Sequence, residues 1–105
     1  MRQLESIEEF NKLKNSQPVI FMFTAGWCPD CRVIDPIMPE VEKKFGNYTF
    51  VSVDRDKFID LCIELDIYGI PSFLAFGEGK ELGRFVSRDR KTQEEIESFI
   101  TELAL

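Results

Sequence analysis

The chain has 105 residues, of which 44% are hydrophobic and 30% are charged, a composition typical of one globular domain with its own core. The net charge of −6 argues against binding to nucleic acid or to anionic membranes, because both need a basic surface. The absence of histidine excludes Ser-His-Asp and Cys-His catalytic sites and most catalytic zinc sites.

The N-terminal sequence MRQLESIEEF is acidic and lacks the apolar segment of a secretory signal. The longest apolar run, 19–23, is too short to cross a bilayer. We therefore expect a cytoplasmic protein that does not enter a membrane. Structural disulfides are rare in the cytoplasm, so the three cysteines are expected to be metal ligands, catalytic thiols or core residues.

The first predicted helix covers residues 6–14, where Ser6 and Glu9 have the spacing of a capping box. Residues 19–23 are apolar at every position, which predicts a central strand covered on both faces.

A second helix is predicted over 34–45, because apolar residues recur there at helical spacing. Pro36 and Pro39 lie inside this pattern and predict a kink. Residues 48–54 then indicate a second buried strand, and 58–65 indicate a third helix.

The last part of the chain predicts a hairpin, with strands over 72–76 and 81–86 joined by a glycine-rich turn. A final helix begins near Gln93, after the capping-box pair Thr92 and Glu95. The order α-β-α-β-α-β-β-α predicts an α/β fold, with a mixed, roughly four-stranded sheet and helices on both faces. We expect residues 1–105 to form a single domain.

The motif Trp27–Cys31, WCPDC, lies where a buried strand ends and a helix begins. Unpaired backbone N–H groups and the helix dipole at that position favour a thiolate at Cys28. Pro29 suits the first helical turn, because its missing N–H costs nothing there. Cys31 lies one turn further on the same side of the helix and can reach Cys28.

This spacing predicts thiol–disulfide exchange. The Cys28 thiolate attacks a substrate disulfide to form a mixed disulfide, and Cys31 then attacks Cys28 to release the reduced substrate. The alternative for a CxxC pair is a zinc site, which normally needs four ligands. Only Cys62 remains as a further cysteine, so we expect no metal and no organic cofactor. Cys62 lies in an apolar helical stripe and is expected to pack in the core, with a regulatory thiol as the alternative.

Several segments together resemble the thioredoxin family. They are the WCxxC motif after a buried strand, Pro36 in the following helix, the sequence 69–72 (GIPS), the turn at Gly79 and the C-terminal helix. The resemblance covers nearly the whole chain and implies the thioredoxin fold and a protein-disulfide reductase activity. The WCPDC sequence is similar to that of thioredoxin-related proteins, whereas main-line thioredoxins carry CGPC.

The resemblance also implies roles for individual residues. The family proline that matches Pro71 is cis and faces the cysteine pair, and the backbone of the matching Ile70 binds an extended substrate segment. Trp27 lies beside the nucleophile. Implied partners are disulfide-containing proteins or small thiols as substrates, and a reductase or a low-molecular-weight thiol as the electron donor.

Three positions depart from the family pattern. Met22 stands where the family has a buried aspartate, and Phe50 is expected to stand where it has the lysine paired with that aspartate. These two groups assist proton transfer at the buried cysteine. Ser87 stands where the family has a glycine beside the substrate groove, and its side chain is expected to narrow the range of partners.

Asp30 and Asp35 are candidates to replace the missing proton acceptor. Asp30 lies inside the motif, and Asp35 lies four residues after Cys31 on the same helix face. Either carboxylate is placed to accept the Cys31 proton directly or through water. The alternative is that both are solvated acids that stabilise the first turn of the helix.

The basic stretch containing Arg88, Arg90 and Lys91 follows the strand that borders the groove in the family. We expect a solvated loop there, with a basic rim for an acidic partner as the alternative. For the protein as a whole we expect a monomeric disulfide reductase. The alternatives are a binding or redox-sensing module, or an oxidase or isomerase that runs the same chemistry in the other direction.

Overall fold

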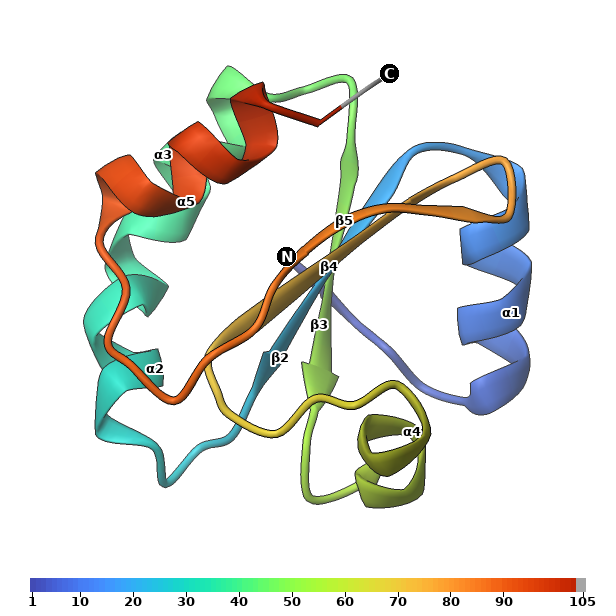
Figure 1. The fold of residues 1–105 in the computed structure, drawn as a ribbon, viewed down its shortest axis with the longest axis horizontal. Helices are drawn as coiled ribbons and strands as arrows, with labels where there is room; N and C mark the ends of the chain where they lie inside the picture. Colours follow the sequence, from blue (N-terminus) through green and yellow to red (C-terminus); the bar gives the residue numbers. More distant parts are fainter. Residues whose placement is uncertain (104–105) are drawn as a thin grey trace.

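The computed structural model describes residues 1–103, which form an α/β fold around a mixed sheet (Figure 1). The five strands are β1 (Arg2–Gln3), β2 (Val19–Thr24), β3 (Thr49–Asp54), β4 (Ser72–Gly77) and β5 (Lys80–Phe85). The helices are α1 (Ile7–Ser16), α2 (Pro29–Ile34), the 3-10 turn η1 (Asp35–Ile37), α3 (Met38–Lys44), α4 (Ile59–Glu64) and α5 (Gln93–Thr101).

The strands lie in the order β1-β3-β2-β4-β5. Strands β2 and β3 are parallel, and β4 is antiparallel to both β2 and β5. These directions confirm the predicted parallel pair and the predicted hairpin. Strand β2 therefore lies at the centre, and its carboxyl end points to the edge of the sheet where α2 begins.

The sheet has one strand more than the sequence predicts. Strand β1 pairs in parallel with β3, opposite Val51 and Ser52. It has only two residues, and both side chains are exposed, so no apolar alternation marks it in the sequence. The predicted count of about four strands is too low by this short edge strand.

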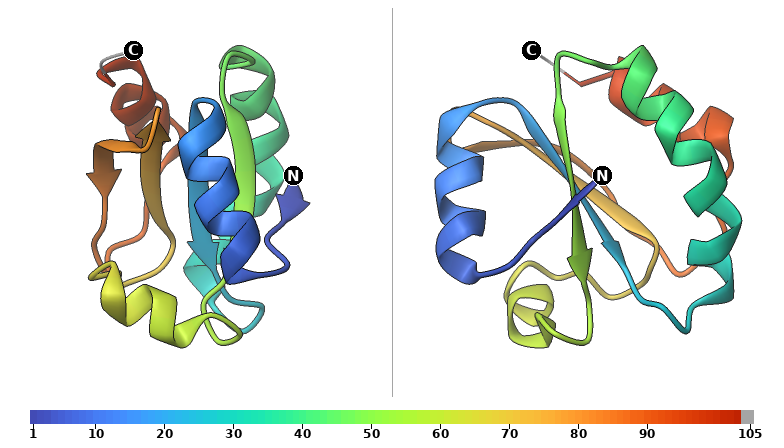
Figure 2. Two further views of the ribbon diagram at one scale, coloured as in Figure 1. Left: turned by 90° about the vertical axis from the view of Figure 1, so that its right-hand side faces the viewer. Right: turned by 180° about the vertical axis from the view of Figure 1, so that it is seen from behind.

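Helices cover both faces of the sheet, as Figure 2 shows in two further views. Helices α1 and α4 lie on one side, and α2, α3 and α5 lie on the other (Figure 1). Strand β2 supplies both cores: Phe21 packs in the cluster with Phe10 of α1, and Ile20 packs in the cluster with Ile34 of α2. Burial on both sides explains why this strand is apolar at every position.

The predicted kink is confirmed, because η1 interrupts the helix between α2 and α3 around Pro36. The capping box at the start of α5 is complete, since the Thr92 and Glu95 side chains each bind the other's backbone N–H. At α1 only half of the box forms. Ser6 accepts the Glu9 N–H, while the Glu9 carboxylate accepts the N–H of Glu5 instead.

Within residues 1–103, no helix has both the length and the apolar character needed to cross a bilayer.

The aromatic contacts beneath α1 generate a prediction about stability. Phe10 is 2% exposed, and its ring centroid lies 4.6 Å from that of Phe21 and 5.9 Å from that of Phe76. We expect Phe10→Ala to lower the free energy of unfolding by about 3–5 kcal/mol, because it leaves a cavity between these rings. Urea denaturation measures the loss, and Phe10→Leu, which keeps most of the volume, serves as the control. Equal losses for the two variants would contradict this account.

Candidate active site

Cys28 is the N-cap residue of α2, directly after the loop that follows β2. The backbone N–H of Cys31 donates to Cys28 Sγ at 3.3 Å, and Pro29 occupies the first turn without needing a hydrogen bond there. The sulfur of Cys28 thus accepts a backbone N–H of the first helical turn, which has no carbonyl partner within the helix. The structure thus brings the two predicted cysteines together, and both are free thiols.

Cys31 is the deeper of the two thiols, with 1% of its surface exposed against 4% for Cys28. Burial, followed by the hydrogen bond with Cys28, raises the pKa of Cys31 to about 11. Hydrogen bonds with the Thr24 side chain and the Ala25 backbone act in the opposite direction. At neutral pH, Cys31 therefore keeps its proton.

Ile70 lies beside Cys28, and Pro71 follows it in the chain. The Ile70–Pro71 peptide bond is cis. The Cys28 thiol lies 3.9 Å from the Ile70 carbonyl oxygen, and the Ile70 side chain packs against Cys28, Cys31 and Ala25. A segment more than 40 residues away in sequence thus forms one wall of the site.

Trp27 forms an exposed part of the rim, with 56% of its surface accessible. Its indole Nε1–H donates to Asp56 Oδ2 at 2.7 Å, and the Arg55 guanidinium lies 5.6 Å from the ring centroid. The sequence pattern of residues 54–57 indicates only a solvated loop. No local signal connects that loop with Trp27, because the contact depends on how β3 lies beside β2.

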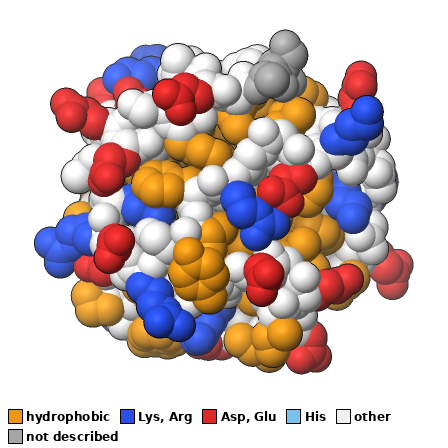
Figure 3. Space-filling view, viewed as in Figure 1, with side chains coloured by type: hydrophobic (Ala, Val, Ile, Leu, Met, Phe, Trp, Pro, Cys, Tyr) orange, Lys and Arg blue, Asp and Glu red, His pale blue; other side chains and the backbone are white. Residues whose placement is uncertain are grey.

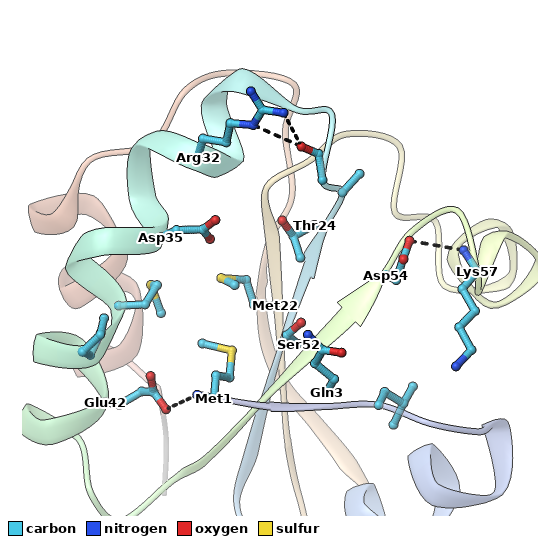
Figure 4. Close-up of a pocket in the computed structure, with 15 residues that line it drawn as sticks. Met1, Gln3, Met22, Thr24, Arg32, Asp35, Glu42, Ser52, Asp54 and Lys57 are labelled. Atoms are coloured by element: carbon cyan, nitrogen blue, oxygen red, sulfur yellow. Dashed lines mark hydrogen bonds and ion pairs between the residues drawn. The ribbon is translucent and has the colours of Figure 1, made fainter.

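The two candidate acids have different surroundings. Asp30 forms an ion pair with Arg90, with 3.0 Å between Oδ1 and Nε. Asp35 is exposed and lines a cavity of about 580 Å³ next to β2. Figure 4 shows Asp35, Met22 and Thr24 facing the same space, with Arg32 directed to a backbone oxygen, that of Gly26.

This cavity reaches the surroundings of the buried thiol. Thr24 and Ala25 line it, and these are the two residues whose hydrogen bonds act on Cys31. Its volume is ample for several water molecules, and its walls carry polar groups, including Asp35 and Ser52, to bind them. Thr24 and Ala25 are therefore shared by the cavity wall and the surroundings of Cys31.

The position beside Met22 differs from the one predicted. In the register of β2 with β3, Met22 lies opposite Ser52, whereas Phe50 lies opposite Ile20. The prediction that Phe50 occupies the place of the family lysine is therefore wrong by two residues. Ser52 carries no charge either, so neither the buried aspartate nor its lysine partner is present.

Lys91 corrects a second prediction, because it is not part of a solvated loop. Only 2% of its surface is exposed, and its Nζ donates to Ser87 O, Ser87 Oγ and Asp89 O at 3.0–3.3 Å. Burial lowers the pKa of Lys91, while the negative charges of Asp89, Glu95 and Asp30 act in the opposite direction. Ser87 binds this ammonium group with its hydroxyl. Arg88 and Arg90 remain near the surface, at Tyr68 and Asp30.

Cys62 packs in the core as predicted, with 1% exposed, in the cluster beneath α1 and α4. Burial raises its pKa to about 11.

Among the residues that the structure describes, no group of three His, Cys, Asp or Glu side chains is arranged to hold a metal ion. On the face shown in Figure 3, acidic and basic side chains are interspersed with apolar ones.

The raised pKa of Cys31 predicts how its reactivity changes with pH. In a Cys28→Ser variant, the rate of Cys31 alkylation should rise with a midpoint well above 9 and close to 11, because desolvation is the main cause of the shift. The measurement is alkylation by iodoacetamide between pH 7 and 11.5, followed by mass spectrometry of the Cys31 peptide. A midpoint at or below about 8.5, the value of an unperturbed thiol, would contradict the assignment.

Comparison with known proteins identifies the family to which the chain belongs. The sequence model of the thioredoxin family, described as "Thioredoxin", matches residues 3–102. The chain is 34% identical to a thioredoxin from Coprinus comatus over 89% of this chain and 91% of the relative. It is 42% identical to an H-type thioredoxin from Fagopyrum esculentum over 75% of this chain and 69% of the relative.

A solved thioredoxin structure has the same fold as this chain. The crystal structure of mitochondrial thioredoxin 3 from Saccharomyces cerevisiae, in its oxidized form, superposes with a TM-score of 0.86. The match covers 98% of this chain and 95% of that one at 22% identity. With the cysteine pair at the start of α2 and a match along nearly the whole sequence, the chain belongs to the thioredoxin family of thiol–disulfide oxidoreductases.

Proposed function

We propose that the protein reduces disulfides in proteins and small molecules, with Cys28 as the attacking thiolate and Cys31 as the resolving thiol. The observation that carries this proposal is the position of Cys28 Sγ, which lies 3.3 Å from the Cys31 N–H and 3.9 Å from the Ile70 oxygen. The difference in burial between the two thiols supports the assignment of roles, because the less buried sulfur is the one a substrate can reach.

The reaction balances in two exchanges. In the first, the Cys28 thiolate attacks one sulfur of the substrate disulfide, and the other substrate sulfur leaves as a thiolate and takes up a proton. In the second, Cys31 loses its proton and attacks Cys28 Sγ, and the remaining substrate sulfur leaves as a thiolate. The substrate gains two electrons, and Cys28 and Cys31 are oxidised to a disulfide.

Trp27, Ile70 and Pro71 are proposed to bind the substrate segment next to Cys28. The exposure of Trp27 and the position of the Ile70 backbone beside the Cys28 sulfur support this role. The Ile70 carbonyl lies beside the Cys28 sulfur, and hydrogen bonds between backbones are the usual basis for binding a polypeptide without regard to its side chains.

Asp35 is proposed as the proton acceptor for Cys31, in preference to Asp30. The cavity that joins Asp35 to Thr24 supports this choice, because water inside it would carry the proton from the thiol. Asp30 is already engaged by Arg90. In this scheme Thr24 passes the proton on through its hydroxyl group.

We further propose that the chain works in the cytoplasm as a single domain over residues 1–105 and as a monomer. A family match over residues 3–102 supports the domain assignment. A free cysteine in the core, Cys62, is consistent with a reducing compartment. A separate reductase or a low-molecular-weight thiol is proposed to return electrons to the oxidised pair.

Trapping of the mixed disulfide tests the roles of the two cysteines. We expect Cys31→Ser to accumulate a covalent complex with a disulfide-bonded peptide, because the resolving thiol is absent. Cys28→Ser should form no complex under the same conditions. Non-reducing electrophoresis and mass spectrometry measure both. A complex formed through Cys31 in the Cys28→Ser variant, or none in either variant, would overturn the proposed roles.

The proton route predicts the effect of changing each acid. Asp35→Asn should slow the second exchange at least tenfold at pH 7, in the range of general-base contributions, and Thr24→Val should slow it as well. Asp30→Asn is the matched control and should leave the rate within about twofold. Stopped-flow Trp27 fluorescence, recorded between pH 6 and 9, follows the step. Slowing by Asp30→Asn alone would reverse the assignment.

A further inference from the structure

A buried lysine lies beside the site without a role in the proposed chemistry. Among residues 1–103, Lys91 is the only charged residue classed as buried. Its three N–H donors meet three neutral oxygens: Ser87 O at 3.3 Å, Ser87 Oγ at 3.1 Å and Asp89 O at 3.0 Å. The Phe85 ring covers the ammonium group from another side, with 5.2 Å from Nζ to the centroid. Because burying a charged group costs free energy, we expect a lysine at this position to have a specific role.

The three acceptors belong to one short segment, residues 86–90, which we call the rim loop. Ser87 contributes both its carbonyl and its hydroxyl, and the hydroxyl also accepts the Asp89 N–H at 3.3 Å. The loop therefore wraps around the lysine head group. The Ser87 hydroxyl is thus one of the three groups that accept a hydrogen bond from Lys91.

The rim loop is in direct backbone contact with Gly69, which lies just before the cis Ile70–Pro71 bond. A Cβ atom added at Gly69 would lie 2.3 Å from Ser87 O and 2.8 Å from Arg88 N, so the backbones touch with no room for a side chain. Tyr68 reinforces the contact, since its hydroxyl donates to Val86 O at 3.0 Å. The next residue after Gly69 is Ile70, whose carbonyl lies beside Cys28.

The other end of the rim loop is attached to the cysteine helix. Arg90 Nε lies 3.0 Å from Asp30 Oδ1, between the two cysteines in sequence. The loop thus joins the two walls of the site: the segment of Gly69 and Ile70 on one side and the start of α2 on the other. Lys91 holds the loop between these two attachments.

We propose that Lys91 is a positioning residue that, through Ser87 and Asp89, fixes the rim loop and with it the backbone at Gly69 and Ile70 that receives an extended polypeptide carrying the disulfide. This inference rests on the proposed function. It assigns Lys91 to the recognition of polypeptide substrates, as distinct from the exchange chemistry at sulfur. Small disulfides, which do not span the rim loop and Ile70, depend on Lys91 much less.

The chemistry of the head group suits this role. An ammonium group has three donors arranged around one nitrogen, which matches three oxygens from one tight loop. A planar guanidinium cannot make the same contacts. Replacement by methionine keeps the contact with Phe85 but removes the donor from two backbone carbonyls and leaves the Ser87 hydroxyl with only the Asp89 N–H, which frees the loop.

The experiment compares two substrates in single-turnover reactions of the pre-reduced protein, so that no reductase is needed. One is a disulfide-bonded peptide of about ten residues, and the other is hydroxyethyl disulfide. Lys91→Met should raise the half-saturation concentration for the peptide about tenfold, as expected for losing hydrogen bonds from a charged donor. The effect on the peptide should exceed the effect on hydroxyethyl disulfide at least fivefold, and the limiting rate with the peptide should change less than its half-saturation.

Two further variants keep the result interpretable. Ser87→Ala removes one acceptor without changing a charge and should act in the same direction with a smaller effect, so it decides the question if Lys91→Met does not fold. Lys14→Met is the matched control, because Lys14 also lies over aromatic rings, Phe10 and Phe76, but on the opposite side of the sheet. It should leave both substrates unchanged.

Equal slowing of both substrates, or no change of the peptide's half-saturation in either Lys91→Met or Ser87→Ala, would overturn the role of Lys91. The unmodified protein separates this failure from that of the proposed function. If it reduces both substrates, the function stands whatever the variants show. If it reduces neither, the proposed function fails, and this inference fails with it.

Discussion

The hydrogen bond from the Cys31 N–H to Cys28 Sγ is the contact on which the rest of the site depends. It exists because β2 ends at the edge of the sheet and α2 begins there with Cys28 as its N-cap. The same turn that leaves backbone donors free at the sulfur of Cys28 buries Cys31 one turn further along. One helix start thereby produces two neighbouring thiols that differ in burial.

The second constraint is the missing acid. With Met22 opposite Ser52, the centre of the sheet offers no ionisable group to take the Cys31 proton. The cavity on that side is lined by both Thr24 and Asp35, and it is the basis of the alternative that we propose outside the core. A buried carboxylate near a buried thiol is costly to ionise, whereas Asp35 lies at the surface and remains hydrated. In the proposed scheme, an exposed acid and a path to it take the place of a core acid.

Much of this arrangement is visible in the sequence. The continuous apolar run in β2, the helical stripes and the WCPDC motif predict the layers of the fold and the position of the cysteine pair. Tertiary contacts are harder to predict. No local pattern in the sequence shows that Lys91, within a run of charged residues, is buried against the backbone of residues 87 and 89. No local pattern shows either that Ser52, and not Phe50, lies opposite Met22. Those facts depend on strand register and on chain reversal, which leave no periodic pattern.

The most direct test of the central claim is the reduction potential of the Cys28–Cys31 pair. The protein is equilibrated in defined thiol/disulfide buffers and alkylated, and its free thiols are counted by mass spectrometry. The buried Cys62 is the thiol expected to remain free at every potential. The account predicts a reducing midpoint, near the roughly −270 mV of thioredoxin. A midpoint above about −180 mV, in the range of disulfide isomerases, or the absence of any disulfide at all potentials, would contradict a disulfide reductase.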